Sequence, residues 1–199
     1  MEHLAACVET AAEMGARLMG GPVVAPIGYL PGHRPTTDEW GWAVEGVQSI
    51  GELLEKNEMT LCLEPVNRSE TFFLRTAEEA RRLCEEIGSS RVGVTIDTFH
   101  ANIEEKSVAG AIAGLGTHLK HVHASENDRG LLGSGHVAFA EIVAVLERSG
   151  YAGYVMIEGF GFSEDEVSAP GALWADLRVS PEVLAERGIA YLRTLRTFD

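Results

Sequence analysis

The chain has 199 residues, the length of a single folded domain, and 45% of them are hydrophobic and 23% charged. This balance is ordinary for a globular protein and excludes a disordered, collagenous or coiled-coil chain. The formal net charge of −14 disfavours nucleic acid as a partner, so a neutral small molecule or a cation is the expected ligand. No apolar stretch approaches the ~20 residues that a membrane-spanning helix needs, so no membrane partner is expected.

The first residues and the cysteines indicate a reducing compartment. The start of the chain lacks a basic region followed by an apolar core, so no secretory signal is visible. Cys7, Cys62 and Cys84 are an odd number of widely spaced thiols, which disfavours a disulfide framework. We therefore expect a cytoplasmic protein.

Strand patterns alternate with helical patterns along the chain. Two capping boxes, Thr36 with Glu39 and Thr76 with Glu79, begin helices, and Gly88 ends the second helix. In chain order, the expected elements are a strand at 17–24, a helix from 36 to about 56, a strand at 59–64, a helix from 76 to 87, a strand at 92–97, a helix at 108–115, a strand at 119–123, a helix at 139–148, a strand at 154–158, a short helix near 173–177 and a helix from 181 to 195. Strands that alternate with helices predict βα units and a parallel sheet.

Four residues that can bind a metal end four successive strands: Glu64, Asp97, His123 and Glu158. Consecutive members are separated by about one strand–helix unit, so parallel strands deliver all four side chains to one rim of the sheet. Three carboxylates at one place repel one another unless a cation lies among them. Oxygen ligands with one imidazole suit Mn²⁺, Mg²⁺ or Co²⁺, so the sequence predicts a single divalent-metal site.

Other polar residues follow these strand ends. Glu70, His100 and Arg129 each lie a few residues beyond one of them. His121 lies two positions before the fourth-strand ligand, so we expect it to face the same interior without binding the metal. The glutamate pair at 104–105 is interpreted as the solvated start of a helix.

Four segments of the chain resemble the ketose 3-epimerases, the group that includes D-tagatose 3-epimerase and D-psicose 3-epimerase. These segments are LEPVNRSETFFLRTAEE at 63–79, DTFHANIEE at 97–105, HVHASENDRGLLGSGH at 121–136 and VMIEGF at 155–160. The resemblance covers essentially the whole chain, and the strings LEPVNRSE and DTFHANIEE are specific to this group. It implies the xylose-isomerase-like TIM barrel of the sugar isomerase/epimerase superfamily.

The resemblance also implies the site's chemistry. One divalent ion, commonly Mn²⁺, Co²⁺ or Mg²⁺, is bound by the four strand-end residues. Glu64 and Glu158 lie on opposite faces of the sugar C3, where one removes a proton and the other returns one. Three residues contact the ketose near its C1 and C2 oxygens: Glu70, His100 and Arg129. The expected activity is divalent-metal-dependent epimerisation of a free ketose at C3 through a metal-stabilised enediolate, with Arg129 and a donor or protonated His100 adding stabilisation at the carbonyl oxygen.

A complete TIM barrel has eight strands and about 250 residues, whereas this sequence predicts only the last five strand–helix units. The expected architecture is therefore an α/β fold in which 1–199 form a single xylose-isomerase-like TIM-barrel domain that lacks its three N-terminal strands. The exposed strand edges of such a barrel favour a homo-oligomer. Three alternatives stay open: a hydroxypyruvate isomerase or an inosose dehydratase of the same superfamily, and a non-catalytic truncated fragment that binds metal or sugar.

Overall fold

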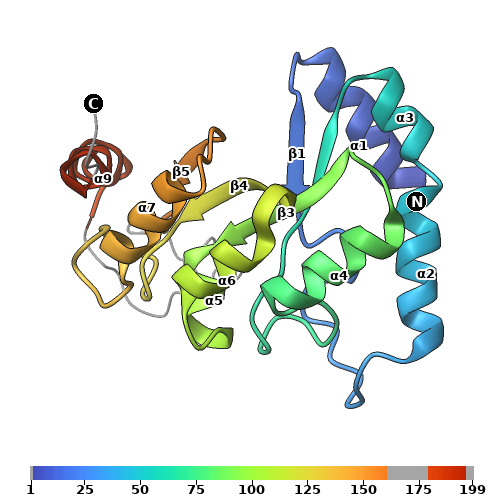
Figure 1. Ribbon diagram of the computed structural model, residues 1–199, viewed down its shortest axis with the longest axis horizontal. Coiled ribbons are helices and arrows are strands. Elements are labelled where there is room, and N and C mark those ends of the chain that lie inside the picture. The colour runs from blue at the N-terminus through green and yellow to red at the C-terminus, as the bar shows by residue number, and fades with distance from the viewer. Residues whose placement is uncertain (1, 161–178, 196–199) are drawn as a thin grey trace.

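The computed structural model describes residues 2–160 and 179–195, and within them five parallel strands form one sheet (Figure 1). Each strand is hydrogen-bonded to the next, so the order across the sheet follows the order in the chain. The strands are β1 (Leu18–Gly21), β2 (Thr60–Leu63), β3 (Val92–Asp97), β4 (Leu119–Ala124) and β5 (Val155–Ile157). The five predicted strands and their parallel pairing are confirmed, with bounds that differ by a few residues.

Helices connect the strands and pack against one another in sequence around the sheet. In chain order they are α1 (Glu2–Glu13), α2 (Thr37–Gln48), α3 (Gly51–Lys56), α4 (Ala77–Ile87), α5 (Thr98–Glu104), α6 (Val108–Leu115), the 3₁₀ helix η1 (Gly116–His118), α7 (Phe139–Arg148) and α9 (Pro181–Leu195). The contacts between helices run from α2 to α4, α4 to α6, α6 to α7 and α7 to α9. A parallel sheet with helices stacked in chain order is the arrangement of an α/β barrel wall.

The capping signals act as the sequence predicts. The side chain of Thr36 accepts a hydrogen bond from the backbone N–H of Glu39, and Thr76 accepts one from Glu79 in the same way. Gly88 follows α4 in the left-handed region, with φ 72°, where glycine carries no Cβ penalty. Local sequence therefore determines where α2 and α4 begin and where α4 ends.

The structure revises the helix predictions at two places, and a third prediction is not tested. The single helix expected from 36 to 56 is divided into α2 and α3, because Ile50 leaves the helical region with φ −104° and ψ 6°. α5 was not expected, and it begins directly after β3 with Asp97 as its N-cap, whose Oδ1 accepts from the Phe99 N–H at 2.9 Å. The short helix expected near 173–177 lies outside the described residues.

The hydrophobic core lies between the sheet and the helices. Leu63, Ile96 and Val122, on the three central strands, are at most 1% exposed. Successive residues of a strand face opposite sides of the sheet. The residue after each of these three therefore faces away from the helices, into the concave side of the sheet: Glu64, Asp97 and His123. Burial of the apolar residues thus dictates the direction in which the predicted ligands point.

The glutamate pair at 104–105 is not a solvated helix start, and that interpretation is wrong. The Glu104 side chain is 2% exposed and accepts from the backbone N–H of Arg68 at 2.8 Å and from its guanidinium at 2.8 and 3.1 Å. Glu105 Oε1 accepts from the Ala77 N–H at 2.7 Å. The pair therefore lies at the end of α5, and its hydrogen bonds hold the segment between β2 and α4, which carries Glu70, against α5.

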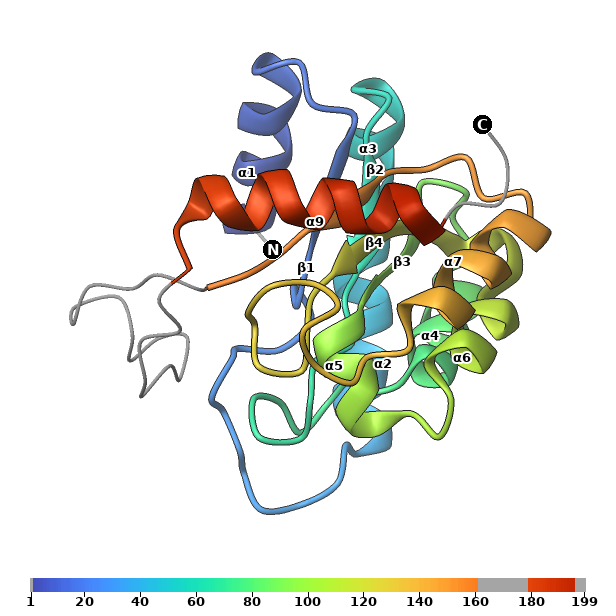
Figure 2. The same cartoon turned by 90° about the vertical axis from the view of Figure 1, so that its left-hand side faces the viewer.

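The last helix, α9, lies in the foreground of Figure 2, at the β5 end of the sheet. It packs on β5 and α7, and its Gly188 faces Ile157, where an added Cβ would lie 2.7 Å from Ile157 Cδ1. Glycine therefore allows this close approach of helix to strand without a shift of the Ile157 side chain. With 15 residues α9 is the longest described helix, and no described helix has the length and apolar character to cross a membrane.

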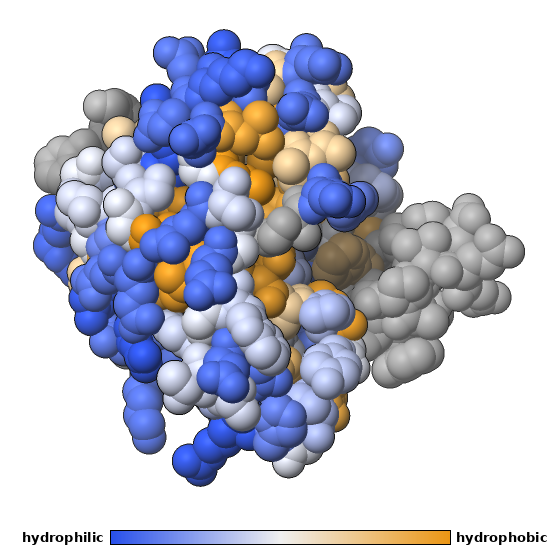
Figure 3. Space-filling model, turned by 90° about the vertical axis from the view of Figure 1, so that its right-hand side faces the viewer, coloured by the Kyte–Doolittle hydropathy of each residue, from blue (hydrophilic) through white to orange (hydrophobic). Residues whose placement is uncertain are grey.

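The two edge strands are less buried than the central ones. All six residues of β3 are buried, whereas β1 has none that is fully buried, and Val155 and Met156 of β5 are 38% and 56% exposed. Figure 3 shows the side on which α1, α2 and α3 lie, where hydrophobic residues are exposed between hydrophilic ones. Within the described residues the sheet is thus open at both edges.

Candidate metal centre

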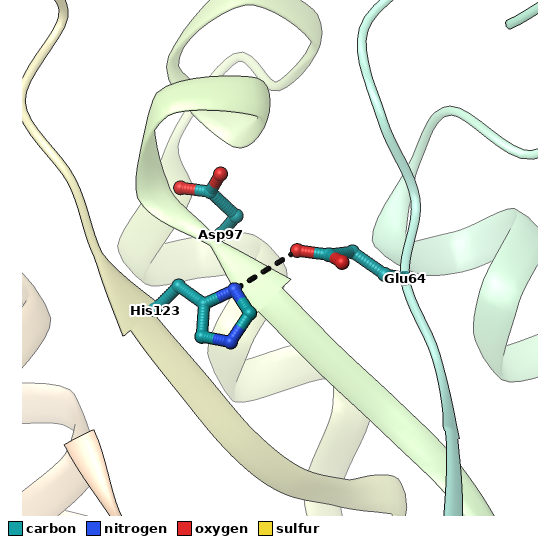
Figure 4. Close-up of side chains that lie close together, drawn as sticks. All are labelled: Glu64, Asp97 and His123. Atoms are coloured by element: carbon teal, nitrogen blue, oxygen red, sulfur yellow. Dashed lines mark hydrogen bonds and ion pairs between the residues drawn. The ribbon is translucent and has the colours of Figure 1, made fainter. Parts of the chain in front are cut away.

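Three of the four predicted ligands converge at the carboxyl ends of neighbouring strands (Figure 4). Glu64 follows β2, Asp97 ends β3, and His123 lies one residue before the end of β4. One ligand atom from each lies within 4.8 Å of the others, and His123 Nδ1 is 3.1 Å from Glu64 Oε1. This spacing and the mixture of carboxylates with an imidazole are what a divalent cation requires.

The fourth predicted ligand, Glu158, approaches the same imidazole. It follows β5 directly, and its Oε2 lies 3.4 Å from His123 Nδ1. The carboxylates of Glu64 and Glu158 therefore reach one nitrogen from β2 and β5, two strands that do not pair with each other. The backbone N–H of Glu158 also donates to the Ala124 carbonyl at 2.9 Å, which holds the residue in register with β4.

The electrostatics of this cluster favour a bound positive charge. Burial lowers the pKa of His123, but the carboxylates of Glu64, Glu158 and Asp97 outweigh it and leave that pKa raised. Burial raises the pKa of Asp97 to about 7, with Glu158 adding to the rise and Arg129 opposing it. Both shifts mean that the cluster holds protons more tightly than isolated side chains would. Because a cation relieves the same repulsion, the donor set fits Mn²⁺, Mg²⁺ or Co²⁺.

Arg129 lies against the ligand carboxylates. Its Nη1 donates to Asp97 Oδ2 at 2.6 Å, to Ser125 Oγ at 3.0 Å and to Glu158 Oε2 at 3.1 Å. The side chains of Arg129 and Asp97 are 9% and 1% exposed, so this is a buried ion pair. The structure thus places Arg129, one of the three predicted substrate contacts, beside the metal cluster.

His100 lies beside both Asp97 and Arg129, and Glu70 lies beside His100. His100 Nε2 is 3.4 Å from Asp97 Oδ2 and 3.1 Å from Arg129 Nη2. Burial, with Arg129 and His123, lowers the pKa of His100 to about 3, so the protonated form considered from the sequence is replaced by a neutral ring. Glu70 Oε1 is 3.9 Å from His100 Nδ1, and its side chain is 37% exposed.

Four further residues support these side chains and were not singled out from the sequence. Asn67 is 3% exposed, and its backbone N–H donates to His100 Nδ1 while its Nδ2 donates to Glu70 Oε1. Three others surround the Arg129 guanidinium, one by a hydrogen bond and two by aromatic faces at 3.9 and 5.1 Å: Ser125, Phe99 and Phe160. All four lie in the segments that resemble the ketose 3-epimerases, which is the signal that could have found them.

His121 faces the same interior as His123, as expected. The two rings are 5.0 Å apart and nearly perpendicular, and His121 is 6% exposed. Burial and the neighbouring His123 lower the pKa of His121. Its Nδ1 is buried and has no hydrogen-bond partner among the described residues, and it does not belong to the cluster of possible ligands.

Comparison with known proteins identifies the family to which this fold belongs. Residues 1–195 match the family described as the xylose isomerase-like TIM barrel, and the chain belongs to that family. Its relatives there include ketose 3-epimerases. A probable ketose 3-epimerase of Synechocystis is 31% identical over 191 residues, which cover 96% of this chain and 67% of the relative. The L-ribulose 3-epimerase of Mesorhizobium japonicum is 32% identical over 194 residues, covering 96% and 65%.

Solved structures of 3-epimerases also superpose on this chain. A structure of L-ribulose 3-epimerase superposes with a TM-score of 0.91 and 32% identity, over 98% of this chain and 67% of that chain. A D-psicose 3-epimerase of Clostridium cellulolyticum with D-tagatose superposes with a TM-score of 0.87 and 27% identity, over 96% and 68%. The chain thus spans about two thirds of the length of these relatives, and its five strands form a half-barrel equivalent to part of their closed barrel.

Proposed function

We propose that the protein epimerises a free ketose at C3 with the help of one divalent metal ion, Mn²⁺ being the first choice. The observation that carries this proposal is the pair Glu64 and Glu158. Their carboxylates come from β2 and β5 and lie 3.1 and 3.4 Å from the same atom, His123 Nδ1. Inversion of a carbon centre needs an acid and a base on its two faces, and two carboxylates that converge from different strands can meet that need.

The proton on C3 of a ketose is weakly acidic, so a carboxylate alone removes it slowly. A divalent ion held by Glu64, Asp97, His123 and Glu158 would supply positive charge beside the C2 and C3 oxygens, which lowers the cost of forming the negative charge. Glu64 then removes the C3 proton on one face, and Glu158 donates a proton on the other. In the reverse direction the two residues exchange these roles.

The remaining polar residues orient the sugar. Arg129 is positively charged and buried, so it is suited to stabilise negative charge that develops on the C2 oxygen. His100 is neutral, and because its Nδ1 accepts from the Asn67 N–H, its Nε2 carries the proton and is the nitrogen that can donate to the sugar. Glu70, which is partly exposed beside His100, can accept a hydrogen bond from the C1 hydroxyl. Relatives solved with D-tagatose, D-allulose and D-fructose support a free ketose as the substrate class.

The test measures turnover and isotope exchange together. The chain is incubated with Mn²⁺ and D-fructose, D-tagatose or D-psicose in deuterium oxide, and the products are followed by NMR. Epimerisation with deuterium at C3 is expected. Epimerisation without deuterium would exclude proton abstraction, whereas turnover of hydroxypyruvate or an inosose instead would assign one of the alternative activities. Binding of metal and sugar without any turnover would support the non-catalytic alternative.

Variants assign the roles of the two glutamates. Glu64→Gln and Glu158→Gln retain the shape of the side chain but lose proton transfer, so each is expected to lower the rate by about 10²–10⁴-fold. Metal content is measured alongside, because each residue is also a proposed ligand. Glu141→Gln, on the exposed face of α7, is the matched control and should leave the rate unchanged. Full activity in both site variants at equal metal content would refute the assignment.

A further inference from the structure

Arg129 has a backbone conformation that side chains seldom adopt. Its φ is 62°, in the left-handed region that favours glycine, and it is one of two non-glycine residues with positive φ in the described chain. Such a conformation persists only where surrounding contacts impose it. The backbone of Arg129 is bonded on both sides, since its N–H donates to the Glu126 carbonyl at 3.0 Å and its carbonyl accepts from the Phe160 N–H at 2.7 Å.

The loop that carries Arg129 folds around a buried carboxylate. Glu126 is 0% exposed, and its Oε2 accepts from the backbone N–H groups of Asn127 at 3.0 Å and Val137 at 3.1 Å. Its Oε1 accepts from the Gly133 N–H at 3.1 Å. Hydrogen bonds to an ionised acceptor are the stronger kind, and a buried charge is tolerated only where such bonds surround it. One side chain thus joins the beginning, middle and end of the loop.

The loop closes tightly on this carboxylate. A Cβ added at Gly135 would lie 2.6 Å from Glu126 Oε2 and closer still to Asn127 Oδ1. Asn127 Oδ1 in turn accepts from the His136 N–H at 2.9 Å. Gly135 therefore leaves the space that the carboxylate and the amide occupy, which is independent evidence that the loop is built around Glu126.

We propose that Glu126 is a positioning residue for Arg129: by accepting three backbone N–H groups it holds the loop so that the guanidinium lies against Asp97 and Glu158. The role in sugar binding rests on the proposed function, whereas the control of Arg129 by Glu126 does not. Both Glu126 oxygens are occupied by loop amides, so this carboxylate is not a fifth ligand of the metal cluster. Pairing of β2, β3 and β4 within the sheet positions Glu64, Asp97 and His123, so their metal binding should survive a disturbance of this loop.

Chemical modification of the full chain tests the proposal without any substrate. Phenylglyoxal reacts with accessible guanidinium groups, and the modified peptides are measured by mass spectrometry. Arg129, whose side chain is 9% exposed, should be protected in the unmodified chain, whereas Arg91, at 31%, should react and serve as the internal reference. In Glu126→Gln an amide N–H₂ must face backbone donors, so the reactivity of Arg129 relative to Arg91 should rise about tenfold or more.

A second variant covers the case in which Glu126→Gln does not fold. Gly135→Ala keeps the carboxylate but places a methyl group against it, so it should expose Arg129 selectively as well. Continued protection of Arg129 in a folded Glu126→Gln chain would overturn the proposal. Loss of cooperative folding in both variants would also overturn it, because the contacts would then hold the whole domain and not one loop.

Sugar binding then separates positioning from general stability. Calorimetry with Mn²⁺ and a ketose should show weaker sugar binding in Glu126→Gln, by about tenfold or more, with Mn²⁺ affinity nearly unchanged. In an Arg129→Gln background the same substitution should have no further effect on sugar affinity, because the group that it positions is gone. An equal loss in both backgrounds would refute positioning through Arg129. If the unmodified chain binds no sugar at all, the proposed function fails while the modification experiment still decides the role of Glu126.

Discussion

Replacing Arg129 with methionine tests how the metal cluster balances its charges. Arg129 Nη1 lies 2.6 Å from Asp97 Oδ2, and the two side chains are 9% and 1% exposed. At pH 8, where Asp97 with its pKa of about 7 is mostly ionised, breaking this buried ion pair by removing one partner costs about 3–5 kcal/mol, because the remaining charge is left without compensation. In a chain of this size 1 kcal/mol shifts Tm by about 2–4 °C, so metal-free Arg129→Met should melt about 6–20 °C lower.

Mn²⁺ should reverse much of this loss. A divalent cation neutralises the carboxylates that Arg129 otherwise faces, so it should bind the variant at least as tightly as the unmodified chain. At a free concentration of about 100 times Kd, a ligand that binds only the folded state stabilises it by about 2.7 kcal/mol. The rise in Tm on adding Mn²⁺ should therefore be as large in Arg129→Met as in the unmodified chain, or larger.

The assay is thermal unfolding followed by circular dichroism, in EDTA and in excess Mn²⁺. Arg91→Met is the matched control, because Arg91 pairs with Glu55 at 2.9 Å with side chains 31% and 54% exposed. An exposed pair contributes about 0–1 kcal/mol, so the control should melt close to the unmodified chain. A loss below about 1 kcal/mol for Arg129→Met in EDTA, or a smaller response to Mn²⁺, would refute the charge balance inferred here.

Three further predictions concern metal, pH and assembly. The chain should bind about one Mn²⁺, and His123→Ala should weaken this binding by about a hundredfold or more, measured by calorimetry; unchanged metal content in both His123→Ala and Asp97→Ala would contradict the site. The raised pKa values of His123 and Asp97, the latter about 7, mean that their protonated forms stabilise the metal-free chain. That stabilisation is lost as pH rises from the unfolded-state pKa values through the folded-state ones, so the metal-free Tm should fall as pH rises from about 4 through 7 while Mn²⁺ affinity rises. Opposite trends in scans of both quantities would refute this assignment. The open edges at β1 and β5 should make the chain self-associate in light scattering, and a monodisperse monomer would show that they are protected.

The strands and the positions that end them could be determined from sequence alone. Short apolar runs at regular spacing predicted the five parallel strands, and the positions of Glu64, Asp97 and His123 at strand ends predicted that they share one rim of the sheet. Capping boxes also located the starts of α2 and α4, because a capping box is a contact between residues only three positions apart. These features are local, so the pattern of residues along the chain contains them.

Only the tertiary structure decided how the loops support the site. The contact of Asn67 with His100 joins residues 33 positions apart, and its donor is a backbone N–H that every residue other than proline carries. The left-handed backbone of Arg129 and the three amides gathered by Glu126 likewise depend on how one loop closes. Charged residues are usually solvated, which is why the sequence predicts a solvated Glu104. In the structure its side chain is buried against Arg68, in the segment between β2 and α4. Such contacts arise from packing between distant segments, and the residue pattern of each segment by itself does not contain them.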